Sequence, residues 1–474
     1  MIPLRRLVPL VLACAFIVGC GTDRIDPVMP DEGTAGPKDH GISWLYYGST
    51  IPEIHIGVSL KEWNSLLQAY DRDPATKLHI HCDVSVVKFR DTTIVTDASL
   101  RLRGNTSRRR PEGGGGSLHS SKGTDWHHCH YEINFHKWHK DADHKVHGAE
   151  KVILKWYKDD PSYVRENFCY DLFRRAGVWT AANAAYARLF IKVEGDAKET
   201  CLGVYDMIEP VAADFLKVRK AEGQFGNADG FLWRCRSGAR LGASAASIGP
   251  DLDDGKEYVY ELKTRTGEFE IAKAQLQDFL SNSNNLGNQR FKAWLSSHCD
   301  VPLLLRTYAV NVAVGMWDDY WNNCNNYYIY FNSTDTKDYG FFFIPYDYDN
   351  TLGTTLDCGV QTDAASQDPF NWGDSRRNPL IWKILQDVEW RAFYAGCLLD
   401  LVSEGGLMSP EAAGDRIRSW QNKIRYFVPN DTHEDEKIED LPAPWSNHRE
   451  YRLLEEGPHN YFTAKRNSIL KYCK

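Results

Sequence analysis

Two runs of β-branched and aromatic residues, Asn326–Phe331 and Phe341–Tyr346, constrain the fold of this chain more than any other feature. A polar segment rich in Asn, Ser, Thr, Asp and Gly joins them, and this pattern predicts an antiparallel hairpin. If Phe331 pairs with Phe341, the far ends of the two runs also face each other, because antiparallel partners keep a constant index sum. The polar residues before the first strand then meet the carboxylates after the second strand.

Side chains that bear oxygen are concentrated at this end of the hairpin. Hard divalent cations bind such ligands, and Mg²⁺ commonly uses one or two carboxylates together with substrate phosphates. The order Asp, Asn, hairpin, Asp is also that of phosphoryl-transfer sites, in which an Asp accepts the hydroxyl proton while Asn and a later Asp bind metal. A polar loop that only caps a buried hairpin explains the spacing equally well. The residues concerned are Asp318, Asp319, Asn326, Asp347 and Asp349.

The segment from Asp318 to Gly353 resembles the signature of the CotH (spore-coat protein H) kinase family. In that family an Asp precedes an N-Y-x-x-Y strand, and a later strand ends in a motif similar to W-D-x-D-x-T-x-G. This chain has N-Y-Y-I-Y from Asn326 and Y-D-Y-D-N-T-L-G from Tyr346. Three upstream segments are similar to family segments in the same order, namely 101–107, 160–172 and 203–209.

The resemblance implies a bilobed α+β protein of the protein-kinase-like fold, with a β-rich N-terminal lobe and a mainly helical C-terminal lobe. It also implies transfer of the ATP γ-phosphoryl group to a Ser or Thr hydroxyl of a protein, with Mg²⁺ or Mn²⁺ as the metal. On this interpretation Asp318 or Asp319 is the catalytic base. Asn326, Asp347 and Asp349 form the metal site.

The resemblance gives a less complete picture of the residues that contact the nucleotide. The family has a K-x-S-Y-like run whose Lys contacts phosphate, but this chain has H-C-H-Y-E from His128 in that place. Lys155 is one substitute, with Glu166 as its helix partner, and Arg103 is another candidate cation. Glu209 is expected near the adenine-side connector. Without the family Lys, a weak kinase and a binding-only relative both remain open, and Lys155 is equally explained as a solvated residue at a strand end.

The first residues of the chain predict export and lipid attachment. Arg5 and Arg6 precede an apolar run that is too short to span a bilayer. The run ends in I-V-G-C, which resembles the bacterial lipobox, with cleavage before Cys20 and acylation of its thiol. We therefore predict a signal peptide over 1–19, a lipid-anchored tether over 20–50, and a membrane lipoprotein of the cell envelope that faces the periplasm or the cell surface. ATP is scarce there, so a kinase would need exported nucleotide or another donor.

Length and patterning predict how the rest of the chain is divided. At 474 residues the chain exceeds the usual size of one hydrophobic core. We predict a β-rich lobe over 51–210 and a second lobe over 211–474 that contains the hairpin region 317–353. Apolar periodicity predicts strands at 186–193 and 202–208, and helices at 162–176, 272–286, 303–314, 382–398 and 412–428. The net charge of −8 argues against a nucleic-acid partner.

The cysteines and histidines leave further interpretations open. Ten cysteines remain beyond Cys20, an even number that permits disulfides in an oxidising compartment. Histidines cluster at short spacings that are common among zinc ligands, although no H-E-x-x-H motif occurs. A strand would place His128 and His130 on one face, which permits a metal site without requiring one. The clustered residues are His127, His128, His130, His136, His139, His144 and His147.

Three functions of other classes remain compatible with the sequence. A catalytically silent surface module could bind glycan or protein through the many Trp and Tyr residues. A glycoside hydrolase would use two carboxylic acids about 5–9.5 Å apart. A transferase with the same site could move a nucleotidyl group instead of a phosphoryl group. The oligomeric state is left open.

Overall fold

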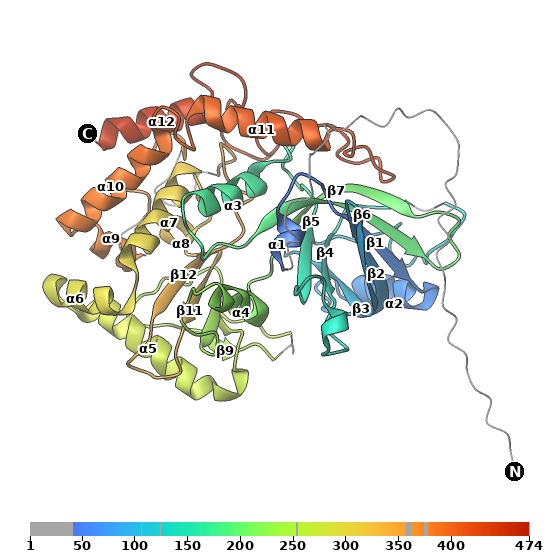
Figure 1. The fold of residues 1–474 in the computed structure, drawn as a ribbon, viewed down its shortest axis with the longest axis horizontal. Coiled ribbons are helices and arrows are strands. Elements are labelled where there is room, and N and C mark those ends of the chain that lie inside the picture. Colours follow the sequence, from blue (N-terminus) through green and yellow to red (C-terminus); the bar gives the residue numbers. More distant parts are fainter. Residues whose placement is uncertain are drawn as a thin grey trace, which may run out of the picture. The chain divides into compact units, whose positions relative to one another are not determined.

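The N-terminal half of the described chain forms a closed seven-stranded barrel. The computed structural model describes residues 41–105, 107–123, 125–252, 255–356, 363–373 and 378–473 (Figure 1). The strands follow the order β1-β2-β3-β4-β5-β7-β6, and β6 closes the barrel by pairing in parallel with β1, whereas the other neighbours are antiparallel. The strands are β1 (Glu53–Val58), β2 (Ile80–Lys88), β3 (Asp91–Arg103), β4 (His130–Asn134), β5 (Lys151–Lys155), β6 (Ala184–Val193) and β7 (Thr200–Ile208).

Alternating side chains fill the barrel. In β2 every second residue from Ile80 to Lys88 is buried, as expected for a strand with one face on a core. Helix α2 (Leu60–Arg72) begins at Ser59, whose side chain caps the backbone N–H of Glu62. Its apolar stripe buries Trp63 in the same core. The barrel therefore has a hydrophobic core of its own.

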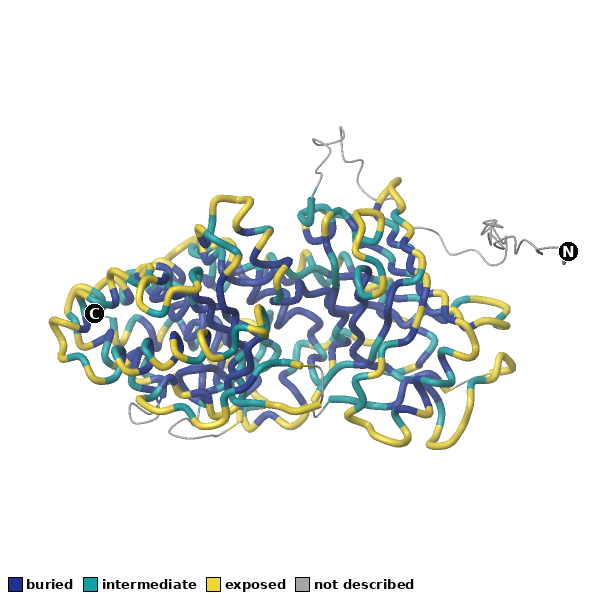
Figure 2. The backbone as a smooth tube through the Cα atoms, turned by 90° about the horizontal axis from the view of Figure 1, so that it is seen from below, coloured by how far each residue is buried: buried dark blue, intermediate teal, exposed yellow. Residues whose placement is uncertain are grey.

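A second sheet lies in the C-terminal half, in the order β12-β11-β8-β10-β9. The hairpin of β11 and β12 has the predicted register, since Phe331 pairs with Phe341 and Tyr327 with Pro345. Helices pack around this sheet in a second core, and Figure 2 shows buried backbone through both the barrel and this helical region. The strands are β8 (Phe231–Cys235), β9 (Ile248–Pro250), β10 (Tyr260–Leu262), β11 (Tyr327–Phe331) and β12 (Phe341–Pro345).

Helices occupy the predicted periodic segments. The segment 162–176 contains α3, and the segment 382–398 is divided between α9 and α10. The α-helices outside the barrel are α3 (Arg165–Arg175), α4 (Ala213–Ala221), α5 (Phe269–Asn285), α6 (Asn288–His298), α7 (Val301–Ala313), α8 (Tyr320–Asn323), α9 (Pro379–Ile384), α10 (Val388–Val402), α11 (Pro410–Ile424) and α12 (Tyr461–Tyr472). The short helix α1 (Ser43–Tyr46) and the 3₁₀ turns η1 (Ala142–His144) and η2 (Thr266–Glu268) complete the elements.

The predicted bilobed protein-kinase-like fold is wrong. The structure has a closed barrel in its N-terminal part, and a five-stranded sheet lies in the part that was predicted to be mainly helical. Local patterns identified β6, β7 and the hairpin strands, but closure depends on the pairing of β1 with β6, which are more than a hundred residues apart. Nothing in the periodicity of a strand specifies a partner so distant in the sequence.

Several predictions concern residues outside the described part of the chain. The signal peptide, Cys20 and most of the tether lie there, and so does Cys358. No disulfide joins any two of the nine described cysteines, so the pairing that their even number permits is not seen among them. Within the described ranges, no helix has both the length and the apolarity needed to cross a membrane.

Candidate functional site

Lys155 is at the centre of the candidate site. It is the last residue of β5 and pairs in the barrel with Asp206 of β7. Its Nζ lies 2.5 Å from an oxygen of Glu166, 2.7 Å from one of Asp347 and 3.3 Å from one of Asp349. The structure therefore brings together one ammonium and three carboxylates from three separate segments of the chain.

Helix α3 positions Glu166 in its first turn. A carboxylate is favoured there by the positive end of the helix dipole. Asp160 fixes the start of this helix, because its side chain accepts hydrogen bonds from the backbone N–H groups of Val164 and Arg165. The buried side chain of Arg165 also pairs with Asp160. This local network explains the conspicuous D-P-S-Y-V-R-E run, of which Glu166 contacts Lys155 and Asp160 also lines the cavity described below.

The ends of the hairpin position the remaining polar groups. Asn326 precedes β11 with φ +56°, and Asp347 follows β12 with φ +64°, so both leave the extended strand conformation at the same end. Asn326 Nδ2 donates to the carboxylate of Asp318 at 2.9 Å. Asp318 also accepts from the amides of Asn323 at 2.6 Å and Asn325 at 3.2 Å. The N-N-C-N-N run before the strand thus holds Asp318 in one orientation.

The adjacent Asp319 has a different role. Its side chain accepts from the backbone N–H of Asn322 at 2.6 Å and caps α8. It also accepts from the buried side chain of Asn311. Burial raises the pKa of Asp319 to about 7, although these hydrogen bonds act against the rise. The sequence left Asp318 and Asp319 as alternatives, and only Asp318 lines the cavity described below.

Burial and the charge of Lys155 act in opposite directions on the pKa of each acid around it, with different outcomes. Burial raises the pKa of Glu166 well above its usual range, with Lys155 acting against it. Burial also acts to raise the pKa of Asp347, but Lys155 outweighs it and lowers that pKa. Burial raises the pKa of Asp349 to about 6, with Lys155 opposing the shift and Asp347 adding to it. Glu166 is therefore the acid whose pKa burial raises most, whereas Lys155 favours the ionised form of Asp347.

Lys155 and its three carboxylate partners line a cavity of about 1470 Å³ between the barrel and the second sheet. Arg103, at the end of β3, lines it and donates to the hydroxyl of Tyr346 at 3.2 Å and to Glu132 at 3.1 Å. Arg234 of β8 is a second guanidinium in the lining. The cavity therefore has cations on the barrel side and on the sheet side, with the acidic cluster between them.

Two further lining residues are His130, which the sequence offered only as a possible metal ligand with His128, and Asp206, which the sequence analysis missed. Burial lowers the pKa of His130 well below its usual range, and its Nδ1 accepts from the backbone N–H of Trp156 at 3.1 Å. His130 is thus a neutral imidazole with its proton on Nε2. Asp206 is 2% exposed, and its two carboxylate oxygens have no hydrogen-bond partner among the described residues. Burial raises its pKa to about 8. The sequence signal that could have identified Asp206 is its place as an acidic residue within the otherwise apolar strand run G-V-Y-D-M-I-E.

The structure does not bring Glu209 into the cavity. Its carboxylate forms two bonds to Arg219, at 2.7 and 2.8 Å, and accepts from Asn183. The pair is buried at the junction of β7 and α4. The sequence prediction placed Glu209 near an adenine-side connector, whereas here it joins a strand to the following helix.

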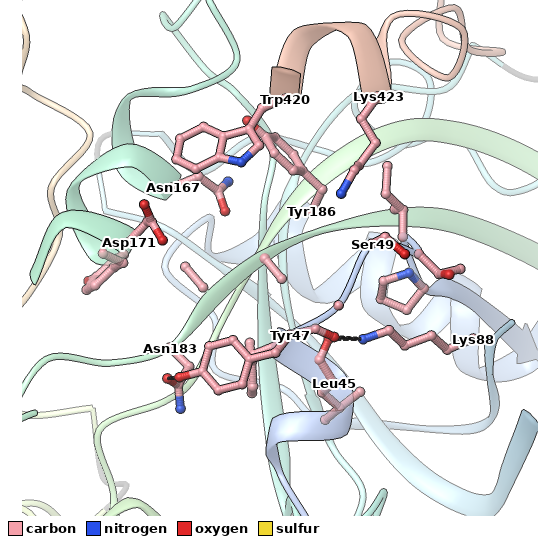
Figure 3. Close-up of a pocket in the computed structure, with 18 of the residues that line it drawn as sticks. Leu45, Tyr47, Ser49, Lys88, Asn167, Asp171, Asn183, Tyr186, Trp420 and Lys423 are labelled. Atoms are coloured by element: carbon pink, nitrogen blue, oxygen red, sulfur yellow. Dashed lines mark hydrogen bonds between the residues drawn. The ribbon is translucent and has the colours of Figure 1, made fainter. Parts of the chain in front are cut away.

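A smaller cavity of about 190 Å³ lies on the other side of α3 (Figure 3). Tyr47 and Asn183 line it and are hydrogen-bonded to each other, while Trp420 and Lys423 of α11 border it. Tyr170 of α3 also lines this cavity, and its hydroxyl accepts from the backbone N–H of Asp347 at 3.2 Å. The helix that carries Glu166 is therefore in contact with both cavities.

Comparisons with known proteins show which family the chain belongs to. A model of the CotH kinase protein family matches residues 100–462, a range that contains every residue of the cluster around Lys155. Inner spore coat protein H of Bacillus subtilis (strain 168) is 27% identical over 294 residues, which are 62% of this chain and 72% of that protein. Because the family model covers well over half of the sequence, the chain belongs to the CotH kinase protein family.

Proposed function

We propose that this protein transfers the γ-phosphoryl group of ATP to a hydroxyl group of a protein, with Mg²⁺ or Mn²⁺ as the metal. The observation that carries the proposal is the contact of Lys155 with Glu166 of α3 and with the two aspartates after β12. Phosphoryl transfer needs little covalent chemistry from a protein, because positioning and neutralisation of charge supply most of the catalysis. This cluster provides groups for both tasks.

The acidic residues fit a divalent metal ion. Glu166, Asp347 and Asp349 each offer a carboxylate oxygen, and these atoms all lie within 4.8 Å of one another. Asp347 and Asp349 are the more exposed pair and face the cavity, so they are the residues that would hold the metal. Such an ion neutralises charge on the transferred phosphoryl group and its leaving oxygen.

Lys155 and Glu166 have a positioning role in this proposal. Glu166 holds the ammonium of Lys155 beside the two aspartates, in the lining of the cavity. There the ammonium can contact a phosphate oxygen. Arg103 and Arg234 line the same cavity and offer planar donors for phosphate. The cavity exceeds the usual size of about 300–1,000 Å³ for a small-molecule site, which leaves room for a nucleotide and part of a protein acceptor.

Asp318 is the residue that we assign as the base. Three side-chain amides hold its carboxylate at the end of the hairpin that also carries Asp347. It can accept the proton of the acceptor hydroxyl as the phosphoryl group moves. Burial raises the pKa of Asp318, with the amide of Asn323 opposing the shift most, so its basicity exceeds that of an ordinary Asp. Asp319 stabilises the segment between Asp318 and Asn326 by capping α8.

The test is label transfer from γ-labelled ATP to the chain itself and to a panel of Ser- and Thr-containing proteins, with Mg²⁺ or Mn²⁺. We expect Asp347→Asn to abolish transfer because it removes a carboxylate of the metal site. Asp318→Asn should lower the rate about 100-fold or more while nucleotide binding is retained. Asp415→Asn, which removes an exposed carboxylate on α11, is the matched control and should leave the rate unchanged.

Alternative outcomes assign other functions. Label from α-labelled ATP would move the assignment to nucleotidyl transfer. Absence of label with either nucleotide and either metal would reject the kinase proposal in favour of a binding module. Equal losses in Asp318→Asn and Asp319→Asn, without a change in stability, would contradict the choice of Asp318.

We also propose that the protein acts outside the cytoplasm, attached to a membrane. The support is the lipobox-like run that ends at Cys20. The similarity to an inner spore coat protein adds a relative whose name places it in a surface structure. The phosphoryl donor must then be exported or replaced, because ATP is scarce outside the cytoplasm.

A further inference from the structure

We propose that His139, Asp141 and His144 form a zinc site on the outside of the barrel, separate from the cavity around Lys155. Each of these residues offers one ligand atom, and the three atoms lie within 4.8 Å of one another. The residues belong to the segment between β4 and β5 and include the last residue of η1. The sequence predicted a possible metal site among seven clustered histidines, and in the structure His139 and His144 are the two that lie close together with Asp141.

The hydrogen bonds prepare His139 to bind a metal. Its Nε2 lies 2.6 Å from a carboxylate oxygen of Asp97. A carboxylate only accepts, so Nε2 carries the proton and Nδ1 of the neutral ring keeps a lone pair. A histidine ligand in proteins almost always donates its other N–H to such a carboxylate, which fixes the ring and raises its basicity. Asp97 thus supplies the supporting contact that metal sites commonly have.

The backbone of β3 directs Asp97 toward this contact. The pairing of β2 with β3 shifts register between Cys82 and Val84, and Asp97 has φ +52° at this irregularity. Irregularities of this kind redirect a side chain out of the regular alternation. The other oxygen of Asp97 lies 2.5 Å from Nδ1 of His81, so one carboxylate holds two imidazoles.

The two remaining ligands are also ordered. His144 Nδ1 lies 2.6 Å from Asp141, whose carboxylate also accepts from the backbone N–H groups at the start of η1. The rings of His139 and His144 stack with their centroids 4.2 Å apart. Zinc bonds of about 2.0–2.1 Å place tetrahedral ligand atoms about 3.3 Å apart, so the three atoms, which lie within 4.8 Å of one another, must move closer by rotation of their side chains when one ion binds.

The nearest lysines do not occupy the site. Lys140 donates to the backbone carbonyl of His136, and Lys145 pairs with Glu150 at 2.9 Å. The ammonium of Lys137 lies 5.9 Å from the ring centre of Trp138. Two imidazoles and one carboxylate suit Zn²⁺ better than Mg²⁺ or Ca²⁺, which prefer oxygen ligands. With three protein ligands, a fourth position stays open to solvent.

The experiment measures binding of Zn²⁺ to the full chain by calorimetry after removal of metals with chelator. The chain carries Asp347→Asn, so that the carboxylates around Lys155 are not a competing site. We expect one equivalent of Zn²⁺, about 100-fold weaker or lost in His139→Gln and in His144→Gln. Asp97→Asn should weaken binding about 10-fold, because it removes the support of His139. His433→Gln, at an exposed histidine elsewhere, is the control and should bind as the parent does.

Absorption of bound Co²⁺ identifies the ligands independently. Tetrahedral Co²⁺ held by nitrogen and oxygen gives visible bands without an intense thiolate band in the near ultraviolet. The proposal is overturned if the parent binds no Zn²⁺, if both histidine variants bind as tightly as the parent, or if a thiolate band appears. Far-ultraviolet circular dichroism in chelator checks that each variant is folded, which matters most for His144→Gln because the side chain of His144 is only 17% exposed.

Discussion

Neighbouring residues in this protein can have unrelated roles, and Asp318 and Asp319 show this most clearly. The first lines the cavity and is held by side-chain amides, and the second caps α8 and contacts Asn311. Two adjacent acids rarely point the same way, so a pair of acids in a motif usually supplies one group to the site. The hydrogen bonds of each carboxylate decide which one it is.

At the residue scale, His55 predicts how stability depends on pH. Burial alone would lower the pKa of His55, but hydrogen bonds to Glu199 and Glu53 outweigh it and raise the pKa to about 9. The unfolded chain has a pKa of about 6.5 for this group. The stabilisation is therefore complete below about pH 6.5 and is lost as pH rises through about 9. His55→Gln should lower the free energy of unfolding by about 1 kcal/mol at pH 6, since partial exposure of Glu199 weakens the pair.

Urea unfolding of both proteins at about pH 6 and about pH 9.5 checks this prediction. The difference between wild type and His55→Gln should be largest at the lower pH and small at the higher one. A difference that is constant, or that grows with pH, would show that His55 is not stabilised as a cation. His433→Gln, which alters an exposed histidine, should show little difference at either pH.

At the scale of elements, the central position of β11 in the second sheet gives the hairpin its stability. It pairs with β12 on one side and with β8 on the other, with Phe331 opposite both Phe341 and Phe231. Gly230 directly precedes β8, and its backbone approaches the hairpin closely. The end of the hairpin that carries Asn326 and Asp347 is held in place by this sheet.

Gly230→Ala tests that close approach. A Cβ atom at Gly230 would lie 1.8 Å from the carbonyl oxygen of Phe331, so one strand must move. We expect a loss of about 3 kcal/mol in the free energy of unfolding, the cost typical of overpacking against backbone. Gly242→Ala is the control, because no atom lies within 4 Å of its added Cβ and it should be close to neutral. Urea titrations measure both, and equal midpoints for the two variants would contradict the packing described here.

At the scale of the whole molecule, the candidate site exists only where separate parts of the chain meet. Lys155 comes from the barrel, Glu166 from α3, and Asp347 and Asp349 from the loop after the hairpin. A substitution that separates the barrel from the second sheet should disrupt the site without removing any of its residues. Tyr170, which lines the small cavity on the other side of α3, also contacts Asp347, because its hydroxyl accepts from the backbone N–H of Asp347.

The proposed location of the whole protein depends on the lipobox-like run that ends at Cys20. If Cys20 carries lipid, the full chain should partition into the membrane fraction of its cells and incorporate labelled palmitate. A mature lipoprotein carries two or three acyl chains, and each buried methylene contributes about 0.8 kcal/mol, so the attachment should withstand high salt. Cys20→Ser should release the protein and abolish labelling. Retention of the unlabelled variant in the membrane fraction would point to another means of attachment.

The sequence by itself determined the hairpin, the strands β6 and β7 and the helices of the periodic segments, because those depend on local patterns. Alternation, turn residues and the constant index sum of antiparallel strands gave the register of β11 and β12. The tertiary structure decided the closed barrel, the orientation of Asp318, the buried ion pair of Glu209 and the convergence of His139 with His144. Each of these depends on contacts between segments distant in the sequence, or on side-chain hydrogen bonds, and residue spacing specifies neither.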